Sequence, residues 1–147
     1  MGCLYGCAVK LVVDTNVVVA GFRSVSGASN RLLRHANDGS VKLLCSTALF
    51  LEYEAVLGRL SIRQATGHTL EDVRGVMNAI AAIAEPVNVP LKTRPTLHDA
   101  DDEMVLEVAL NGDADFIVTH NARDFEPARA LGIEVTTPGE IVRSLRK

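Results

Sequence analysis

The sequence predicts an α/β fold, in which a central parallel sheet carries helices on both faces. Short apolar, mostly β-branched runs alternate along the chain with longer segments whose apolar residues recur at helical spacing. The first run, Val9 to Val13, is nearly continuously apolar and ends at an acid. Such a run is typical of a strand that is buried on both faces of a parallel sheet.

The same alternation continues through the N-terminal half. A short helix is expected over Asn30 to Ala36, closed by the polar turn at residues 37–39. Val41 to Cys45 is a second apolar run and predicts a second strand. Ser46 follows it directly and is a good N-cap, so another helix is expected to start at this point.

That next helix, expected over Thr47 to Leu60, decides which acidic side chain faces the core. Glu52 and Glu54 are two residues apart, so on a helix they point about 200° away from each other. Glu52 lies nearer to the apolar stripe, so we expect it at the edge of the buried face and Glu54 in solvent. The stripe consists of Leu49, Tyr53, Val56 and Leu60.

The middle of the chain predicts one long helix and then an extended connection. Thr69 to Ala84 has apolar residues at helical spacing. Prolines at positions 86, 90 and 95 then interrupt regular structure. Val87 to Val89 is a short strand at most, so the third strand of the sheet is expected to be small.

The C-terminal third alternates again. A helix is expected over Asp101 to Asn111, with Gly112 suited to the left-handed position that ends many helices. Phe116 to Thr119 and Ile133 to Val135 predict two more strands. Residues 137–140, Thr-Pro-Gly-Glu, combine a capping residue, a proline at the first helical position and a capping-box glutamate, so the last helix starts there.

Length and composition restrict the class of protein. The chain has 147 residues, 48% of them apolar, and no repeat or long linker divides it, so we expect one domain over residues 1–147. No apolar window is long enough to span a bilayer. Cys3, Cys7 and Cys45 have no CxxC spacing, which fits a reducing compartment. A cytoplasmic protein is therefore expected.

Acidic and amide side chains follow the predicted strands at the edge where open α/β sheets bind their ligands. Asp14 comes directly after the first strand, and Asn121 and Asp124 come just after a later one. Asp102 falls in the first turn of its helix, where the helix dipole favours an anion. We expect these side chains and Glu52 to converge.

Converging carboxylates repel one another and lose solvation, so they are favourable only beside a cation. Carboxylate and water oxygens are the ligands that Mg²⁺ and Mn²⁺ prefer. Asp14 and Asp102 are the best candidates for direct ligands, whereas Glu52 and Asp124 are expected to position a second ion or an attacking water. The four histidines have no spacing typical of zinc, and no Ser–His or Cys–His arrangement offers a nucleophile.

Several of these acids also have a simpler interpretation. An Asp at a strand end, such as Asp14, is often a turn residue or a helix cap, and both interpretations stay open for Asp124. For Asp99 and Asp101, capping of the following helix is the expected role. The acids expected in solvent are Glu54, Glu71, Asp72 and Glu107.

Four motifs, in this order and spacing, resemble the PIN domain family. They are Val-Asp-Thr-Asn-Val at 13–17, Ser46 followed six residues later by Glu52, Asp-Ala-Asp-Asp at 99–102, and the segment from Ala114 to Phe125. The resemblance covers nearly the whole chain. It is closest to small prokaryotic PIN proteins of the VapC type, which are toxins of toxin–antitoxin pairs.

The resemblance implies a three-layer α/β/α sandwich and a Mg²⁺- or Mn²⁺-dependent endoribonuclease. By matching positions its acids would be Asp14, Glu52, Asp102 and Asp124, with Asn16 holding the loop at the first acid. Many family members have Asp at the position of Asn121, so here Asp124 is expected to supply the fourth carboxylate. The resemblance further implies an RNA substrate, an antitoxin partner and a homodimer.

RNA affinity would have to come from individual side chains, because the net charge is −3. With four Phe and two Tyr, no aromatic platform for base stacking is expected. His120 is near the predicted site, and a loop histidine without a catalytic role is the expectation. The candidate RNA-binding arginines are Arg23, Arg31, Arg34, Arg59, Arg63 and Arg123.

Other classes with acid-rich α/β sites fit less well. A response-regulator receiver needs a lysine late in the sheet, and none follows Lys92 until Lys147. A haloacid-dehalogenase-like phosphatase needs Asp-x-Asp at the first strand, where residues 14–16 are Asp-Thr-Asn. A PIN domain that binds RNA or protein without turnover is the serious alternative, and a turnover assay separates it from a nuclease.

Overall fold

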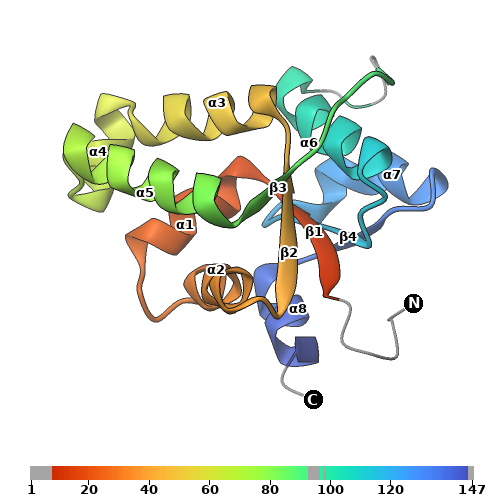
Figure 1. Ribbon diagram of the computed structural model, residues 1–147, viewed down its shortest axis with the longest axis horizontal. Coiled ribbons are helices and arrows are strands. Elements are labelled where there is room, and N and C mark those ends of the chain that lie inside the picture. The colour runs from red at the N-terminus through yellow and green to blue at the C-terminus, as the bar shows by residue number, and fades with distance from the viewer. Residues whose placement is uncertain (1–7, 93–96, 98, 146–147) are drawn as a thin grey trace.

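The computed structural model describes residues 8–92, 97 and 99–145. Within them, five parallel strands form one sheet in the order β3-β2-β1-β4-β5 (Figure 1). The predicted α/β fold with a parallel sheet is therefore confirmed. The strands are β1 (Val9–Val13), β2 (Val41–Cys45), β3 (Ala84–Pro86), β4 (Phe116–Val118) and β5 (Glu134–Thr136).

Helices cover both faces of the sheet, which confirms the three-layer α/β/α arrangement. In Figure 1, α1 to α5 lie to the left of β2, and α6 and α7 lie to its right. Helix α8 packs against α2. The bounds are α1 (Thr15–Arg23), α2 (Ala28–Asp38), α3 (Thr47–Leu57), α4 (Leu60–Thr66), α5 (Leu70–Ile83), α6 (Ala100–Asn111), α7 (Glu126–Ala130) and α8 (Pro138–Leu145), with a 3-10 helix η1 (Ala122–Phe125) before α7.

The core lies where the central strand meets the helices. Leu11, Val12 and Val13 of β1 are completely buried, as expected for a strand that is covered on both faces. Val105 and Leu106 of α6 are completely buried as well. Burial of each such side chain stabilises the folded state by about 1.5–3 kcal/mol. The carboxyl end of β1 is therefore held rigidly in place. No helix in the described part of the chain is long and apolar enough to cross a membrane.

Helix α1 is not predicted by the sequence alone. Asp14 is its N-cap, because the carboxylate Oδ1 accepts a hydrogen bond from the backbone N–H of Thr15 at 2.8 Å. Val17 and Val18 in its first turns are buried. Valine favours strands by propensity, so tertiary packing and the cap stabilise this helix. α1 therefore leads directly away from the end of the central strand.

The helix predicted over Thr47 to Leu60 ends three residues earlier than predicted, and Leu60 begins a separate helix. α3 ends at Leu57, and Arg59 is in an extended conformation just before α4 begins. Leu60 is 62% exposed, so its place in the predicted buried stripe is wrong. The other three members of that stripe are buried as predicted.

Two smaller predictions are also wrong. The third strand is Ala84–Pro86, paired with β2, and Val87 to Val89 lies outside it. Gly112 has φ −99°, so it is not left-handed; Asp113 takes the positive φ, 53°, instead. Aspartate tolerates this conformation because its short side chain can form local hydrogen bonds.

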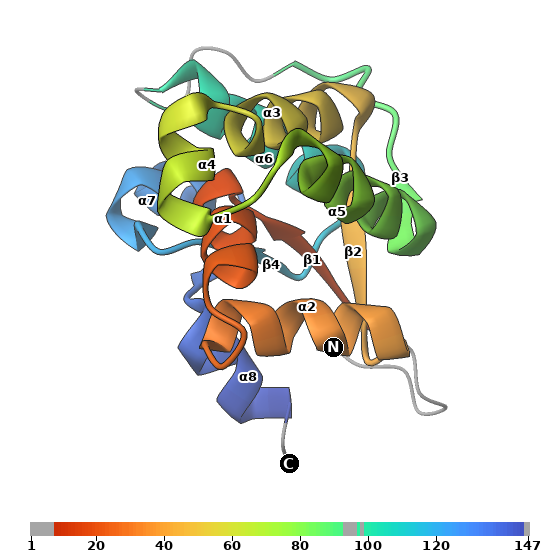
Figure 2. The same cartoon turned by 90° about the vertical axis from the view of Figure 1, so that its left-hand side faces the viewer.

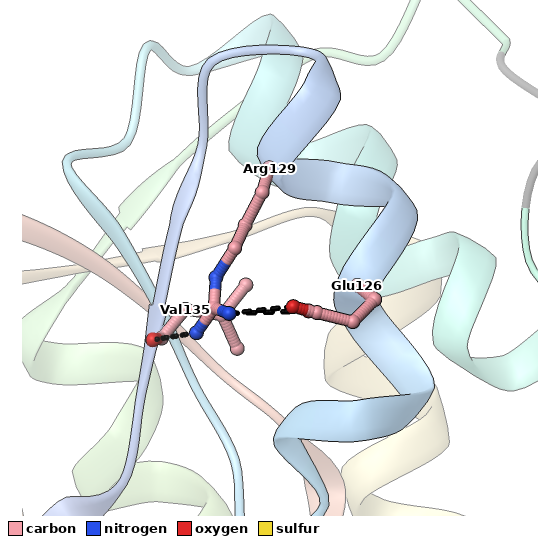
Figure 3. Close-up of polar contacts among 3 residues, drawn as sticks. All are labelled: Glu126, Arg129 and Val135. Carbon is pink, nitrogen blue, oxygen red and sulfur yellow. Dashed lines mark hydrogen bonds and ion pairs between the residues drawn. The ribbon is translucent and has the colours of Figure 1, made fainter.

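The outer edge of β5 is covered by Arg129 of α7 (Figure 3). The carbonyl of Thr136 accepts from Thr119 N–H at 3.0 Å and so faces β4, which leaves the Val135 carbonyl pointing away from the sheet. Arg129 Nη2 donates to that carbonyl at 3.1 Å. Its Nη1 pairs with Glu126 of the same helix at 2.5 Å, so the side chain that connects α7 to the outer strand is held at both ends.

Candidate active site

A cavity of about 490 Å³ opens at the carboxyl end of β1. Every site residue predicted from the sequence lies on it, although these residues come from α1, α3, α6 and the segment after β4. Two further acids, Asp99 and Asp101, join them. The acidic and amide residues of its lining are Asp14, Asn16, Glu52, Asp99, Asp101, Asp102, Asn121 and Asp124.

Asp14 is the most buried acid of the cavity, at 8% exposure. Besides capping α1 through Oδ1, it accepts a hydrogen bond at Oδ2 from the Thr119 hydroxyl at 2.7 Å. Burial raises the pKa of Asp14, these two hydrogen bonds lower it, and the carboxylates of Asp124 and Asp99 raise it further. The net effect is a raised pKa. Asp14 thus caps a helix and is, at the same time, repelled by neighbouring carboxylates.

Two buried hydroxyl groups hold the segment that carries Asp14, and the sequence does not single out either as a site residue. Thr119 is completely buried, and its hydroxyl oxygen accepts from Asn121 N–H at 3.0 Å while donating to Asp14. Tyr53, also completely buried, donates to the Val13 carbonyl at 2.5 Å. In the sequence, the only indication of these two residues is a polar group within an otherwise apolar run. Together the two hydroxyls join α3, β1 and the segment after β4.

Asp102 lies half-buried in the first turn of α6. Burial and then the carboxylates of Asp14, Asp99, Asp124 and Asp101 raise its pKa to about 7. A fifth negative charge is unfavourable among four others, whereas a cation at the same place is favoured. The negative charges of the cavity therefore favour binding of a positive ion.

Asp99 and Asp101, at the start of α6, both line the cavity, but only one of them caps the helix. Asp99 is the N-cap and accepts from Asp101 N–H at 2.8 Å, as predicted. Asp101 lies in the first turn with its side chain on the cavity, so its predicted capping role is wrong. Burial raises the pKa of half-buried Glu52, Asp101 raises it further and Arg59 opposes the shift. Glu54 is exposed, as predicted.

The segment after β4 forms the outer rim of the cavity. Asn121 and Asp124 are exposed there. Asn16 Oδ1 accepts from His120 N–H at 3.4 Å, which joins the segment after β1 to the one after β4. The exposed His120 ring lies off the cavity, with Nε2 at 3.2 Å from the Ser29 hydroxyl. His120 is therefore not part of the cavity lining, and that it has no catalytic role stays a prediction.

Two glutamates of α6 are buried on another side of the helix. Glu103 and Glu107 are each 2% exposed, so the prediction that Glu107 is solvated is wrong. Glu103 accepts a hydrogen bond from Leu97 N–H. Glu107 lines a separate cavity beside Ser46 and Val87. A carboxylate can thus be buried in the framework of this protein as well as in its candidate site.

The donors around the acidic cavity fit Mg²⁺ or Mn²⁺ in charge and in chemical type. Among the residues that the structure describes, no three His, Cys, Asp or Glu side chains are arranged to hold an ion by themselves. Magnesium commonly keeps several waters and is held through one or two carboxylates. The arrangement therefore suits an ion that is bound partly through water.

Comparisons with known proteins agree with this architecture. A family model of the PIN domain matches residues 10–123. A chain in the crystal structure of VapBC2 from Rickettsia felis, bound to a DNA fragment from their promoter, matches with TM-score 0.60 and 13% identity over 87% of this chain and 98% of that chain. A chain of FitAcB from Neisseria gonorrhoeae matches with TM-score 0.50 and 20% identity over 88% and 98%. No curated protein matches the chain.

Proposed function

This chain belongs to the PIN domain family, and we propose that it is a divalent-metal-dependent endoribonuclease that hydrolyses RNA phosphodiester bonds. One observation carries the proposal: carboxylates from separate elements line one cavity at the carboxyl end of the central strand. Their mutual repulsion costs free energy that a bound cation would offset. Structural stability alone therefore does not explain why these acids lie together, whereas binding of a cation does.

The proposed roles follow from where each acid lies. Asp14 and Asp102 would hold Mg²⁺ or Mn²⁺ together with Glu52, and Asp124 at the rim would hold a second ion or orient the attacking water. When bound, the metal would supply a water of lowered pKa and stabilise charge at the scissile phosphate. Thr15 N–H and the Thr119 hydroxyl keep the Asp14 carboxylate in one orientation, and Asn16 and Asn121 support the two segments that flank it.

We further propose that the chain is the toxin of a toxin–antitoxin pair. This rests on the family and on the fold that it shares with chains of VapBC2 and FitAcB. An antitoxin protein, a homodimer and a cytoplasmic location belong to the same proposal by analogy. Light scattering of the purified chain, alone and with the product of a neighbouring gene, tests the dimer and the partner.

The decisive experiment is cleavage of a panel of structured RNAs by the purified chain with Mg²⁺, Mn²⁺ or a chelator. We expect metal-dependent cleavage, and a loss of about a hundredfold or more in Asp14→Asn, because an oriented metal ligand is removed. Glu54→Gln is a matched control, since Glu54 is exposed on α3 and off the cavity. It should cleave like the wild type.

The opposite result has an equally clear meaning. If wild type and Asp14→Asn are both inactive with either metal while RNA is still bound, the nuclease proposal fails. The chain would then be a PIN domain that binds RNA without turnover. Retained activity in Asp14→Asn would instead exclude Asp14 as a ligand.

A further inference from the structure

Two of the six candidate RNA-binding arginines, Arg23 and Arg59, lie on the acidic cavity. Arg23 is the last residue of α1, and Arg59 directly precedes α4. Both are exposed, and within the described part of the chain neither guanidinium forms an ion pair with an acidic side chain. Two positive charges without an ion pair on one cavity are a favourable place for an anion, although Arg59 also interacts with Glu52 at longer range.

The α1 side of the cavity changes in character from one helical turn to the next. Asn16 is beside the acids, Val19 and Ala20 follow one turn later, and Arg23 comes after another turn. Residues three, four and seven apart share a helix face, so all four line the same side. At 1.5 Å per residue, Arg23 lies about 10 Å along the axis from Asn16.

The α3 side repeats this order. Glu52 is at the acidic end, Val56 follows four residues later, and Arg59 comes seven residues after Glu52. Ile62 of α4 adds a further apolar side chain. α1 packs against both α3 and α4, and Figure 2 shows α1 beside α4. Both sides of the cavity lining thus pass from polar to apolar to arginine.

We infer that this apolar stretch and its two arginines form a subsite for nucleotides of single-stranded RNA that flank the bond to be cleaved. The inference rests on the proposed function, because the carboxylates define where the scissile phosphate lies. The planar fork of Arg23 and of Arg59 matches a phosphate, and the partly buried Val19 and Ile62 contact the base. A distance of about 10 Å spans roughly three stacked nucleotides, or fewer in an extended strand.

RNA is favoured over an acidic peptide by the composition of the cavity. An acidic peptide would satisfy the arginines, but its charges would also be repelled by the carboxylates of the same cavity. An RNA strand carries one phosphate per nucleotide, so one molecule places a phosphate at the metal-neutralised acidic end and one further phosphate at each arginine. It also brings a flat apolar base between them.

Binding of a short, fluorescently labelled single-stranded RNA to full-length Asp14→Asn protein with Mg²⁺ tests the charged part. We expect the double variant R23A/R59A to bind about tenfold or more weakly at low salt. The slope of log affinity against log salt should fall in magnitude by about 1.4, since each lost phosphate contact removes about 0.7. The matched control R74A/R143A removes two exposed arginines of α5 and α8, which are off the cavity, and should change affinity less than about twofold.

Ile62→Ala tests the apolar part of the subsite. Ile62 is only half-buried, so the variant should fold. We expect RNA binding to weaken about fivefold with an unchanged salt slope, because apolar contact is lost and no phosphate contact is. An RNA without bases at the flanking positions should bind equally well to the Asp14→Asn parent and to the same protein with Ile62→Ala added. Equal loss for both RNAs would exclude the base contact.

The subsite is overturned if R23A/R59A binds RNA with the affinity and salt slope of the parent, or if the R74A/R143A control shows the same loss. Arginine-dependent binding of polyglutamate in preference to RNA would assign the subsite to an acidic peptide instead. Because Asp14→Asn binding does not depend on turnover, arginine-dependent RNA binding without wild-type cleavage refutes the nuclease and keeps the subsite. If the wild type cleaves RNA and R23A/R59A cleaves it equally well, the nuclease proposal stands and the subsite is refuted.

Discussion

Asp102 and Glu103 are neighbours at the start of α6, yet their carboxylates meet opposite surroundings. Glu103 is almost fully buried and accepts a hydrogen bond from the backbone N–H of Leu97. Asp102 is less buried, but it faces other carboxylates, and its pKa is about 7. Burial alone therefore does not separate an acid that we propose to be functional from a structural one. The surrounding charges do, because an acid among acids is favourable only when a cation joins them.

Asp14 lies between these two cases. It has two hydrogen-bond donors, as a structural acid would, and it also has carboxylate neighbours that raise its pKa. Its donors orient the carboxylate without neutralising the surrounding charge. An acid that is held in place and still repelled is well suited to bind an ion in one defined position.

The largest expected effect is on turnover in Asp102→Asn. We expect the rate of metal-dependent RNA cleavage to fall about a hundredfold or more, because a ligand is lost. The free energy of unfolding without metal should stay the same or rise, because repulsion within the cavity decreases. Initial rates and urea unfolding measure the two quantities. An unstable Asp102→Asn protein would show that Asp102 is structural, like Glu103.

The second effect is the reverse pattern in Glu103→Ala. Leu97 N–H loses its acceptor and a buried side chain is removed, so we expect the free energy of unfolding to fall by about 3 kcal/mol. Cleavage per folded molecule should change little. Glu103→Gln keeps an acceptor oxygen and should lose less stability. If Glu103→Ala unfolds at the same urea concentration as wild type, the contrast between the two neighbours disappears.

The smallest expected effect is the pH dependence of the metal-free protein. The folded-state pKa of Asp102 is about 7, above its ordinary value of 3.8, so between these values the folded state binds more protons than the unfolded state. Stability should therefore fall as pH rises from about 4 to 7, by on the order of 1 kcal/mol after allowance for partial exposure. The difference between wild-type and Asp102→Asn unfolding curves isolates this effect. A difference that does not vary with pH would contradict the raised pKa.

Much of the fold follows from local pattern. The apolar runs predict β1 and β2 at their observed bounds, and the Thr137–Glu140 capping box is present, with backbone-to-side-chain hydrogen bonds of 3.2 Å in both directions. Helix α1 does not follow, because Val17 to Val19 favour a strand locally and only packing stabilises the helix. Leu60 fails for a similar reason: a continuous periodic pattern does not reveal that the backbone turns at Arg59.

The candidate site could be predicted where the argument needs only the position of a residue along its own strand or helix. The rule of strand carboxyl ends brings Asp14 and Asp124 to one edge, and helical geometry favours Glu52 over Glu54. Residues whose role depends on a distant partner, such as Thr119 and Tyr53, could not be predicted, because the partner belongs to the tertiary structure. For the same reason the sequence offers six arginines, and only the cavity distinguishes Arg23 and Arg59.

The contact between Arg129 and the Val135 carbonyl has a consequence for how copies of this protein behave at high concentration. An edge strand with free backbone groups is a template on which a strand of another molecule can extend the sheet into a fibre. At β5 the outward carbonyl is already occupied. At β3, the opposite edge, Pro86 has no N–H to donate. Both margins of the sheet are thus protected against growth, which favours a dispersed protein over an aggregate.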